Sequence, residues 1–149
     1  MRPLTGADFA EARAVADDWF GRPVGLTMHR LFFEELGACG VRASLPPGDR
    51  MVGVLLGFRS EAHPELAYVH FHMVDPAARG QGIGRTLYEE FGRRMHDRGC
   101  TRVRALAAPT NAGSLRFHEA LGFEGRFAGE YVGPGQDRVV FERALPFGA

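Results

Sequence analysis

The sequence lacks the cysteine patterns that mark metal-binding or disulfide-rich proteins. Its 149 residues include only two cysteines, Cys39 and Cys100. Neither belongs to a C-x-x-C motif or to a Cys/His cluster, which argues against a structural zinc site and a disulfide framework. We therefore expect both cysteines to be reduced core residues.

Long apolar runs and an excess of one charge are missing as well. No segment approaches the roughly 18 apolar residues of a membrane-spanning helix, and the N-terminus has no apolar signal region. Eighteen basic and 18 acidic residues balance, so the charge favours neither a nucleic-acid nor a membrane partner. Repeats and low-complexity tracts are also lacking. We expect one domain over residues 1–149, soluble and cytoplasmic.

The most informative segment covers residues 74–88, which read as a strand end, a glycine-rich turn and an amphipathic helix. Gly80, Gly82 and Gly84 let the main chain approach an oxygen closely, and Arg79 adds a positive charge. Unpaired N–H groups and the dipole at a helix start attract an anion. The segment predicts a site for a phosphate-bearing ligand, although the glycines can also serve tight packing alone.

Two common phosphate-binding motifs do not fit this segment. A P-loop ends in Gly-Lys-Ser/Thr, whereas this chain has Gly84, Arg85 and Thr86 and lacks the required earlier glycine. The dinucleotide pattern G-x-G-x-x-G would need glycine where Arg85 stands. A nucleotide site of either kind is therefore not predicted.

Hydrophobic periodicity predicts a mixed α/β sheet. The antiparallel strands come first, then a strand–helix–strand crossover and a final hairpin, which places helices on both faces. The expected helices are one capped at Thr5 and ending near Phe20, then 27–36, a third from Ile83 to Gly99, and 114–121. The expected strands are 39–45, 50–58, 66–74, 103–107, 123–132 and 137–145.

Two blocks carry a family resemblance. The first is R-x-x-G-x-G at Arg79, Gly82 and Gly84, and the second runs from Asn111 to Gly122-Phe123. Together they resemble the GNAT superfamily of acyl-CoA-dependent N-acyltransferases, over roughly residues 66–126. The resemblance implies a three-layer fold: a mostly antiparallel sheet with a central parallel strand pair and helices on both faces. It also implies an N-acetyltransferase that takes its acetyl group from acetyl-CoA.

The resemblance assigns residues to the cofactor. Relatives hold the pyrophosphate on the amides of the glycine-rich turn and the pantetheine arm beside the preceding strand. Asn111 would contact the arm, although a helix cap alone would also explain it. The implied set is Met73, Val74, Arg79, Gly80, Gln81, Gly82, Ile83, Gly84, Arg85, Asn111, Phe117 and His118.

The resemblance also suggests a catalytic acid. Many relatives use a tyrosine seven residues after the asparagine, and His118 stands there in this chain. A histidine can donate a hydrogen bond to the leaving sulfur in either protonation state. A core histidine that touches the cofactor only by packing is the alternative.

Acyl transfer also needs a base, because an amine with a pKa near ~10.4 is mostly protonated at neutral pH. Tyr68, His70, His72 and Val74 should share one face of their strand if no bulge intervenes. His70 matches the second histidine of the arylalkylamine N-acetyltransferases, and Tyr68 falls where the first would sit. We expect His70 to act as base through water, with a structural role as the alternative. Two histidines on one strand could also bind a metal, but no third ligand stands at a recognisable spacing, so no metal site is predicted.

The resemblance also implies that the first two helices and their linker recognise the acceptor, and the candidates there are Trp19, Phe20, Arg22 and Phe33. A core tryptophan is the alternative reading. We expect a primary amine on a small molecule or peptide, and the resemblance is compatible with a homodimer through the C-terminal strands. A different acyl-CoA, or a non-catalytic acyl-CoA-binding sensor or partner module, stays open.

Overall fold

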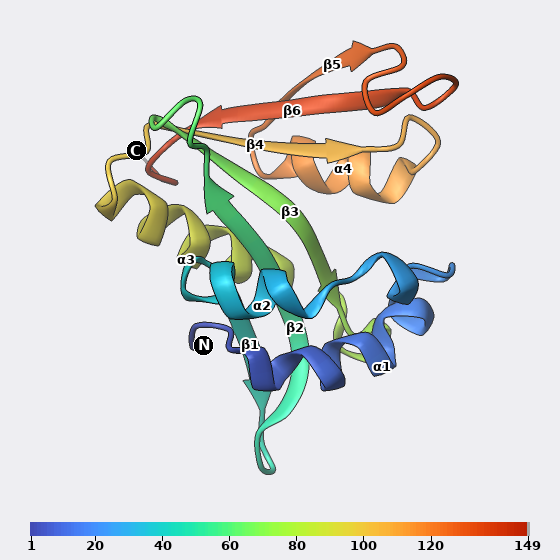
Figure 1. Cartoon of the computed structure of the whole chain (residues 1–149), viewed down its shortest axis with the longest axis vertical. Coiled ribbons are helices and arrows are strands. Elements are labelled where there is room, and N and C mark those ends of the chain that lie inside the picture. The colour runs from blue at the N-terminus through green and yellow to red at the C-terminus, as the bar shows by residue number, and fades with distance from the viewer. Residues whose placement is uncertain (149) are drawn as a thin grey trace.

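Within residues 1–148, which the computed structural model describes, six strands form one sheet in the order β1-β2-β3-β4-β6-β5 (Figure 1). β3 and β4 are parallel, and the other neighbouring pairs are antiparallel. The prediction of a mixed sheet with one parallel pair is confirmed. The strands are β1 Val41–Leu45, β2 Arg50–Arg59, β3 Leu66–Val74, β4 Arg102–Ala107, β5 Glu124–Ala128 and β6 Arg138–Ala144.

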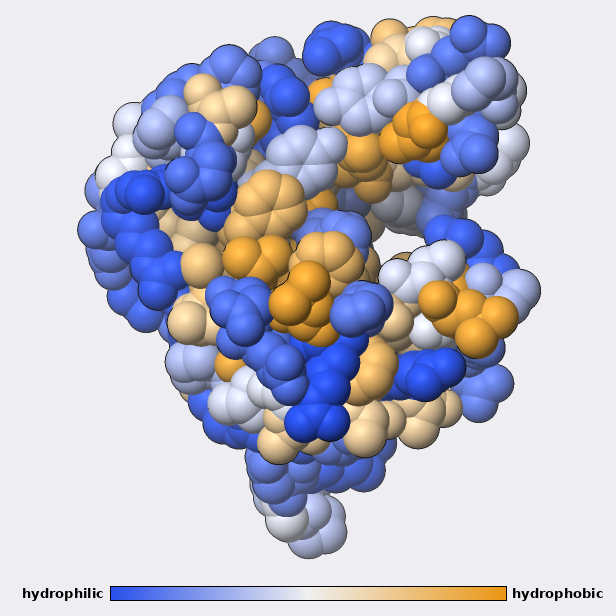
Figure 2. All heavy atoms as spheres, in the orientation of Figure 1, coloured by the Kyte–Doolittle hydropathy of each residue, from blue (hydrophilic) through white to orange (hydrophobic). Residues whose placement is uncertain are grey.

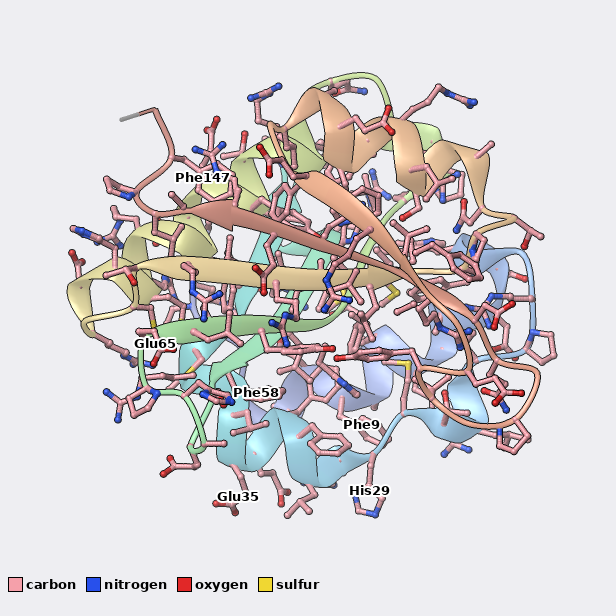
Figure 3. All side chains as sticks on the ribbon, turned by 90° about the horizontal axis from the view of Figure 1, so that it is seen from above. Phe9, His29, Glu35, Phe58, Glu65 and Phe147 are labelled. Atoms are coloured by element: carbon pink, nitrogen blue, oxygen red, sulfur yellow. The ribbon has the colours of Figure 1, made fainter. Side chains whose placement is uncertain are left out.

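Helices cover both faces of this sheet, as predicted. One buried cluster joins α3 and α4 to the sheet, and a second joins α1 and α2 to it. Figure 3, which views the molecule from above, shows Phe9 and His29 on the side of α1 and α2, with the other two helices beyond the sheet. The helices are α1 Phe9–Phe20, α2 Arg30–Leu36, α3 Ile83–Asp97 and α4 Ala112–Ala120.

α3 forms where the apolar spacing predicts it. Leu87, Phe91 and Met95 are fully buried, and Gly99, with a φ of 92°, follows the helix end. The helix lies so close to β2 that a Cβ on Gly57 would come within 2.4 Å of the Phe91 ring. A glycine is therefore needed opposite Phe91, and α3 is fixed firmly against the strands that carry the site.

α2 begins three residues later than predicted. The Asp17 carboxylate accepts hydrogen bonds from the N–H groups of Val24 (2.8 Å) and Gly25 (2.6 Å), and residues 25–27 form a 3-10 turn. The helix is capped instead by His29, whose ring accepts a hydrogen bond from the N–H of Leu31 (3.0 Å). The apolar spacing alone placed the helix start at 27, but contacts with α1 decide the local conformation.

Some strand ends were also predicted too long. The first strand starts at Val41 rather than at 39, because Gly37–Cys39 form a 3-10 turn. The last two strands end at Ala128 and Ala144 and are shorter than the predicted 123–132 and 137–145. Both cysteines are free, and Cys100 is buried as predicted while Cys39 is only partly buried.

Candidate active site

β3 and β4 are paired at one end only, which leaves an opening between them. The pairing joins Leu66–Tyr68 of β3 to Arg102–Arg104 of β4 and stops there. Beyond that point the two strands diverge (Figure 1), because β3 continues beside β2 while β4 follows β6. Figure 2 shows a deep notch on this side, between the C-terminal hairpin and the linker that joins α1 to α2.

The edge of β3 that borders this opening has free backbone groups. Asp75 donates its N–H to Val52 of β2 (2.9 Å), and in antiparallel pairing only alternate residues bond to the same neighbour. Met73 therefore also faces β2, whereas the backbone of His72 and Val74 faces the opening. The sequence predicted pantetheine contacts at Met73 and Val74, but the register turns the Met73 backbone toward β2 and leaves the backbone of His72 and Val74 at the opening.

The turn before α3 presents N–H groups at the end of the same strand. Gly80 and Gly82 have left-handed φ values of 78° and 80°, and a Cβ at either would meet no atom within 4 Å. The first intrahelical bond joins Thr86 N–H to the Gly82 carbonyl (3.0 Å), and no side chain caps the helix. The N–H groups of Ile83, Gly84 and Arg85 are therefore open to an anion.

The two arginines of the turn are bound to backbone carbonyls. Arg79 donates from Nη2 to the Trp19 carbonyl at the end of α1 (2.7 Å) and from Nε to the Val74 carbonyl (3.3 Å). Arg85 donates to the Ala120 carbonyl of α4 (3.1 Å). Both side chains are exposed, so they keep a positive field at the turn while they also tie it to two helices.

Phe117 lies directly against the start of α3. A Cβ on Gly84 would come within 3.0 Å of the Phe117 ring, which explains a glycine at this position. Exposed Gln81 and partly buried Ile83 complete the predicted turn. The structure therefore brings together the predicted turn, Val74 and Phe117 around one end of the opening.

His118 points into the core rather than into the opening. It is 2% exposed and lies parallel to the Phe141 ring at 4.8 Å. Its Nδ1 lies 2.8 Å from the Ser114 carbonyl and its Nε2 lies 2.8 Å from the Tyr88 hydroxyl. Because a carbonyl only accepts, Nδ1 carries the proton and Nε2 accepts from Tyr88. The ring therefore has no free nitrogen for a leaving sulfur, unlike the acid expected at this position.

A bulge separates the two histidines of β3. Leu56 of β2 pairs with Phe71 and Gly57 pairs with Val69, so His70 is an extra residue in the strand. As a result His70 packs on Phe32 of α2 (4.9 Å), whereas His72 packs on Phe117 of α4 (5.0 Å). The two histidines were expected to share one face only if no bulge intervened. Because the strand has a bulge, they lie on opposite faces.

His70 and Tyr68 remain on the side of α2. His70 is accessible to solvent, and the partial desolvation of its ring between Phe32 and Phe71 lowers its pKa. Tyr68 stacks on Phe58 (5.7 Å), and burial together with the neighbouring Tyr131 raises the pKa of its hydroxyl. His70 is thus a neutral ring that can accept a proton, while Tyr68 stays protonated and can only donate or accept a hydrogen bond.

The four residues predicted to contact the acceptor differ in burial, from fully buried to exposed. Phe33 is 1% exposed and packs on Phe9 and Phe71, so its assignment to the acceptor site is corrected to the core. Trp19 and Phe20 are partly buried against the cluster under α1. Arg22 is exposed and its guanidinium lies 5.9 Å from the centre of the Phe20 ring.

Asn111 caps α4, where its Oδ1 accepts a hydrogen bond from the Ser114 N–H (3.1 Å). We expect Asn111→Ala to cost about 1 kcal/mol and to lower Tm by roughly 2–4 °C. Thermal unfolding with and without acetyl-CoA measures both roles, with the neighbouring exposed Thr110→Ala as control. A variant that loses its acetyl-CoA stabilisation would show that Asn111 contacts the cofactor instead.

Acid should destabilise the fold through two histidines that the fold holds neutral, half-buried His72 and buried His118. Burial lowers the pKa of His72 to about 3 and also lowers that of His118. The unfolded chain therefore binds protons that the folded chain excludes once the pH falls below ~6.5, at up to about 1.4 kcal/mol per pH unit and ring. Above pH ~6.5 the rings are neutral in both the folded and the unfolded chain, so this loss of stability is absent.

The slope of Tm against pH, measured from about pH 7 to about pH 5, tests this. We expect a shallower slope in His72→Phe than in wild type, and an unchanged slope in the control His63→Gln, which alters an exposed histidine. Equal slopes in all three proteins would mean that His72 is not held neutral by the fold.

Residues 1–148 contain neither a candidate metal site nor a candidate membrane-spanning helix. No group of three or more His, Cys, Asp or Glu side chains is arranged to hold a metal ion. No helix in the same range is both long and apolar enough to cross a membrane.

Comparison with known proteins agrees with this geometry. Residues 9–123 match the model of the family described as "Acetyltransferase (GNAT) family". A mycothiol acetyltransferase of Mycobacterium marinum is 35% identical over 130 residues, which are 80% of this chain and 37% of that protein. The chain spans between 25% and 37% of the length of the curated relatives it matches.

Solved structures share the fold at lower identity. A putative GNAT acetyltransferase of Desulfovibrio desulfuricans superposes with a TM-score of 0.83 at 20% identity, over 98% of both chains. The diaminobutyrate acetyltransferase of Paenibacillus lautus, solved with L-2,4-diaminobutyric acid and coenzyme A, gives 0.74 at 21% identity, over 99% of this chain and 95% of that one. These likenesses show that the three-layer architecture is that of the acetyltransferases.

Proposed function

The chain belongs to the acetyltransferase (GNAT) family, and from this membership we propose that it transfers the acetyl group of acetyl-CoA to a primary amine. The amine attacks the thioester directly while both substrates are bound. The observation that carries the proposal is the placement of two sets of free N–H groups. One set lies at the uncapped start of α3, and the other lies on the β3 edge at His72 and Val74.

The first set of N–H groups fits the pyrophosphate of CoA. Ile83, Gly84 and Arg85 offer their N–H groups, and the positive φ of Gly80 and Gly82 leaves the approach open. The guanidinium of Arg79 adds positive charge while it holds the Trp19 carbonyl. This half of the site binds and orients the donor, and it accounts for the glycines of the turn.

The second set fits the pantetheine arm and the thioester. An amide-bearing arm can pair with the free N–H groups of His72 and Val74 and with the His72 carbonyl, as an added strand would, while the Val74 carbonyl accepts from Arg79. An N–H at this edge can also stabilise the oxyanion that develops on the thioester carbonyl, a contribution of about 3 kcal/mol in other enzymes. The thiolate leaves readily, because a thiol pKa near ~8.5 makes it a tolerable leaving group.

His70 provides the base in this proposal. Its ring is exposed and neutral, and it lies on the side of β3 that faces α2, where the acceptor enters. It takes the proton of the attacking amine through a water molecule. Tyr68, on the same side, offers a hydroxyl to the acceptor.

A thermal shift assay with acetyl-CoA, NADH and ATP in parallel tests donor use. At a hundred times its dissociation constant a ligand adds about 2.7 kcal/mol, which raises Tm by roughly 5–10 °C in a chain of this size. We expect acetyl-CoA alone to give this shift. Stabilisation by NADH or ATP and not by acetyl-CoA would overturn the proposal.

Release of the CoA thiol with a panel of amines then tests turnover. The panel includes L-2,4-diaminobutyric acid, the compound in the solved relative, and peptides with free N-termini, each assayed with acetyl-, propionyl- and succinyl-CoA. We expect acetyl-CoA to be the best donor with at least one small or peptidic amine. Acetyl-CoA binding without thiol release from any member would favour a sensor or partner module instead.

A further inference from the structure

Four rings form a cluster between the opening and the core. His72 of β3 stacks on Phe117 of α4 at 5.0 Å and meets the Tyr88 ring of α3 edge-on at 5.0 Å. His118 lies 6.2 Å from His72 and 5.5 Å from Tyr88. Three of these rings carry polar atoms, so each atom needs a partner or access to solvent.

Tyr88 and His118 satisfy each other inside the cluster. The Tyr88 hydroxyl donates to Nε2 of His118, and Nδ1 of that ring donates to the Ser114 carbonyl. The two side chains are 1% and 2% exposed. Neither can bond to a ligand unless this pair first breaks.

His72 differs from both. Among residues 1–148, no hydrogen bond is made by either of its ring nitrogens, and no side-chain nitrogen or oxygen there is both fully buried and unpaired. The His72 nitrogens must therefore reach solvent, although the ring is packed on Phe117 and Tyr88. Burial keeps this ring uncharged, so one nitrogen carries a hydrogen and the other accepts.

The position of His72 places it along the path of the donor. Its own backbone faces the opening between β3 and β4, two residues before Val74. Phe117, on which it stacks, also packs against Gly84 at the start of α3. The ring thus lies beyond the turn that fits the pyrophosphate, at the strand edge that fits the arm.

We propose that His72 is a catalytic residue whose ring N–H donates a hydrogen bond to the sulfur of the bound donor. The proposal rests on the proposed function, because it requires CoA in this opening. As the C–S bond breaks, its electron pair stays on sulfur and the His72 N–H stabilises the thiolate. The hydrogen remains on the ring, and the proton that finally reaches sulfur is the one that His70 received from the amine, returned through water.

The pKa of the thiol of bound CoA tests this without an acceptor. Thiolate absorbance in the ultraviolet is titrated for CoA bound to wild type, to His72→Phe, which keeps a ring on Phe117, and to His72→Gln, which keeps an N–H donor. His63→Gln, at an exposed histidine, is the control. A charge-assisted hydrogen bond should lower the thiol pKa by about one unit in wild type relative to His72→Phe.

The outcomes separate the two proposals. His72→Gln should recover at least half of the shift, and the control should match wild type. Equal thiol pKa values in wild type and His72→Phe would overturn the role of His72, and so would equal increases in the Phe and Gln variants, which would indicate packing alone. A wild-type protein that binds no CoA would contradict the proposed function itself.

Discussion

Gly82→Asp should weaken acetyl-CoA binding about 100-fold relative to Gly82→Asn, a difference of ~2.7 kcal/mol. A carboxylate at this position stands beside the uncapped start of α3, where it repels a pyrophosphate and satisfies the N–H groups that would bind it. The side chain has room, because a Cβ on Gly82 would meet no atom within 4 Å. Isothermal titration with acetyl-CoA measures the effect.

The Asn variant is the matched control for backbone strain. Gly82 has a φ of 80°, and among residues with a Cβ, Asn and Asp tolerate this region best. The two variants therefore differ mainly in charge. If both bind acetyl-CoA equally well, the anion does not sit on this turn.

His70→Gln should lower kcat/KM about 100-fold with the best amine of the panel, the usual contribution of a positioned base. Partial burial lowers the pKa of His70, so the ring stays neutral down to a pH below ~6.5. In wild type, kcat/KM should therefore fall as the pH drops through that lowered pKa, where the base becomes protonated. This acid limb should disappear in the variant.

The pH profile of kcat/KM for wild type, His70→Gln and His63→Gln decides the assignment. The exposed His63 controls for the loss of a histidine as such, and its variant should keep the wild-type profile. An acid limb that persists unchanged in His70→Gln would assign it to another group, and a kcat/KM close to wild type would leave His70 a structural residue.

Sequence patterns predicted the elements with strong local signals. The four-residue apolar spacing of α3 and the boundaries of β3 were read correctly, because the apolar residues of each segment pack against the core. The glycine-rich turn was also placed correctly, because the positive φ values at Gly80 and Gly82 follow from the residue type itself and need no distant contact.

Features that depend on distant contacts were missed. No local pattern marks the bulge at His70, which arises from the pairing of β3 with β2. The same holds for His118, whose partner Tyr88 lies 30 residues earlier on another helix, and for Phe33, which α1 and β3 bury. A tyrosine on α3 opposite a histidine on α4 is the one sequence signal that could have suggested the buried pair.

Hydrogen bonds from side chains to the backbone near the end of α1 also depend on distant contacts. No local pattern shows that the Asp17 carboxylate accepts from the N–H groups of Val24 and Gly25 and so shapes the linker after α1. Arg79 reads as a phosphate ligand, but it also holds the Trp19 carbonyl. The turn before α3 and the linker after α1 are thus joined through the end of α1.

A crystal structure with bound acetyl-CoA tests the central claim most directly. We expect the pyrophosphate on the N–H groups of Ile83, Gly84 and Arg85, and the pantetheine arm paired with the backbone of His72 and Val74 in the opening between β3 and β4. A pyrophosphate bound away from the start of α3, or an arm that leaves the β3 edge unpaired, would contradict it.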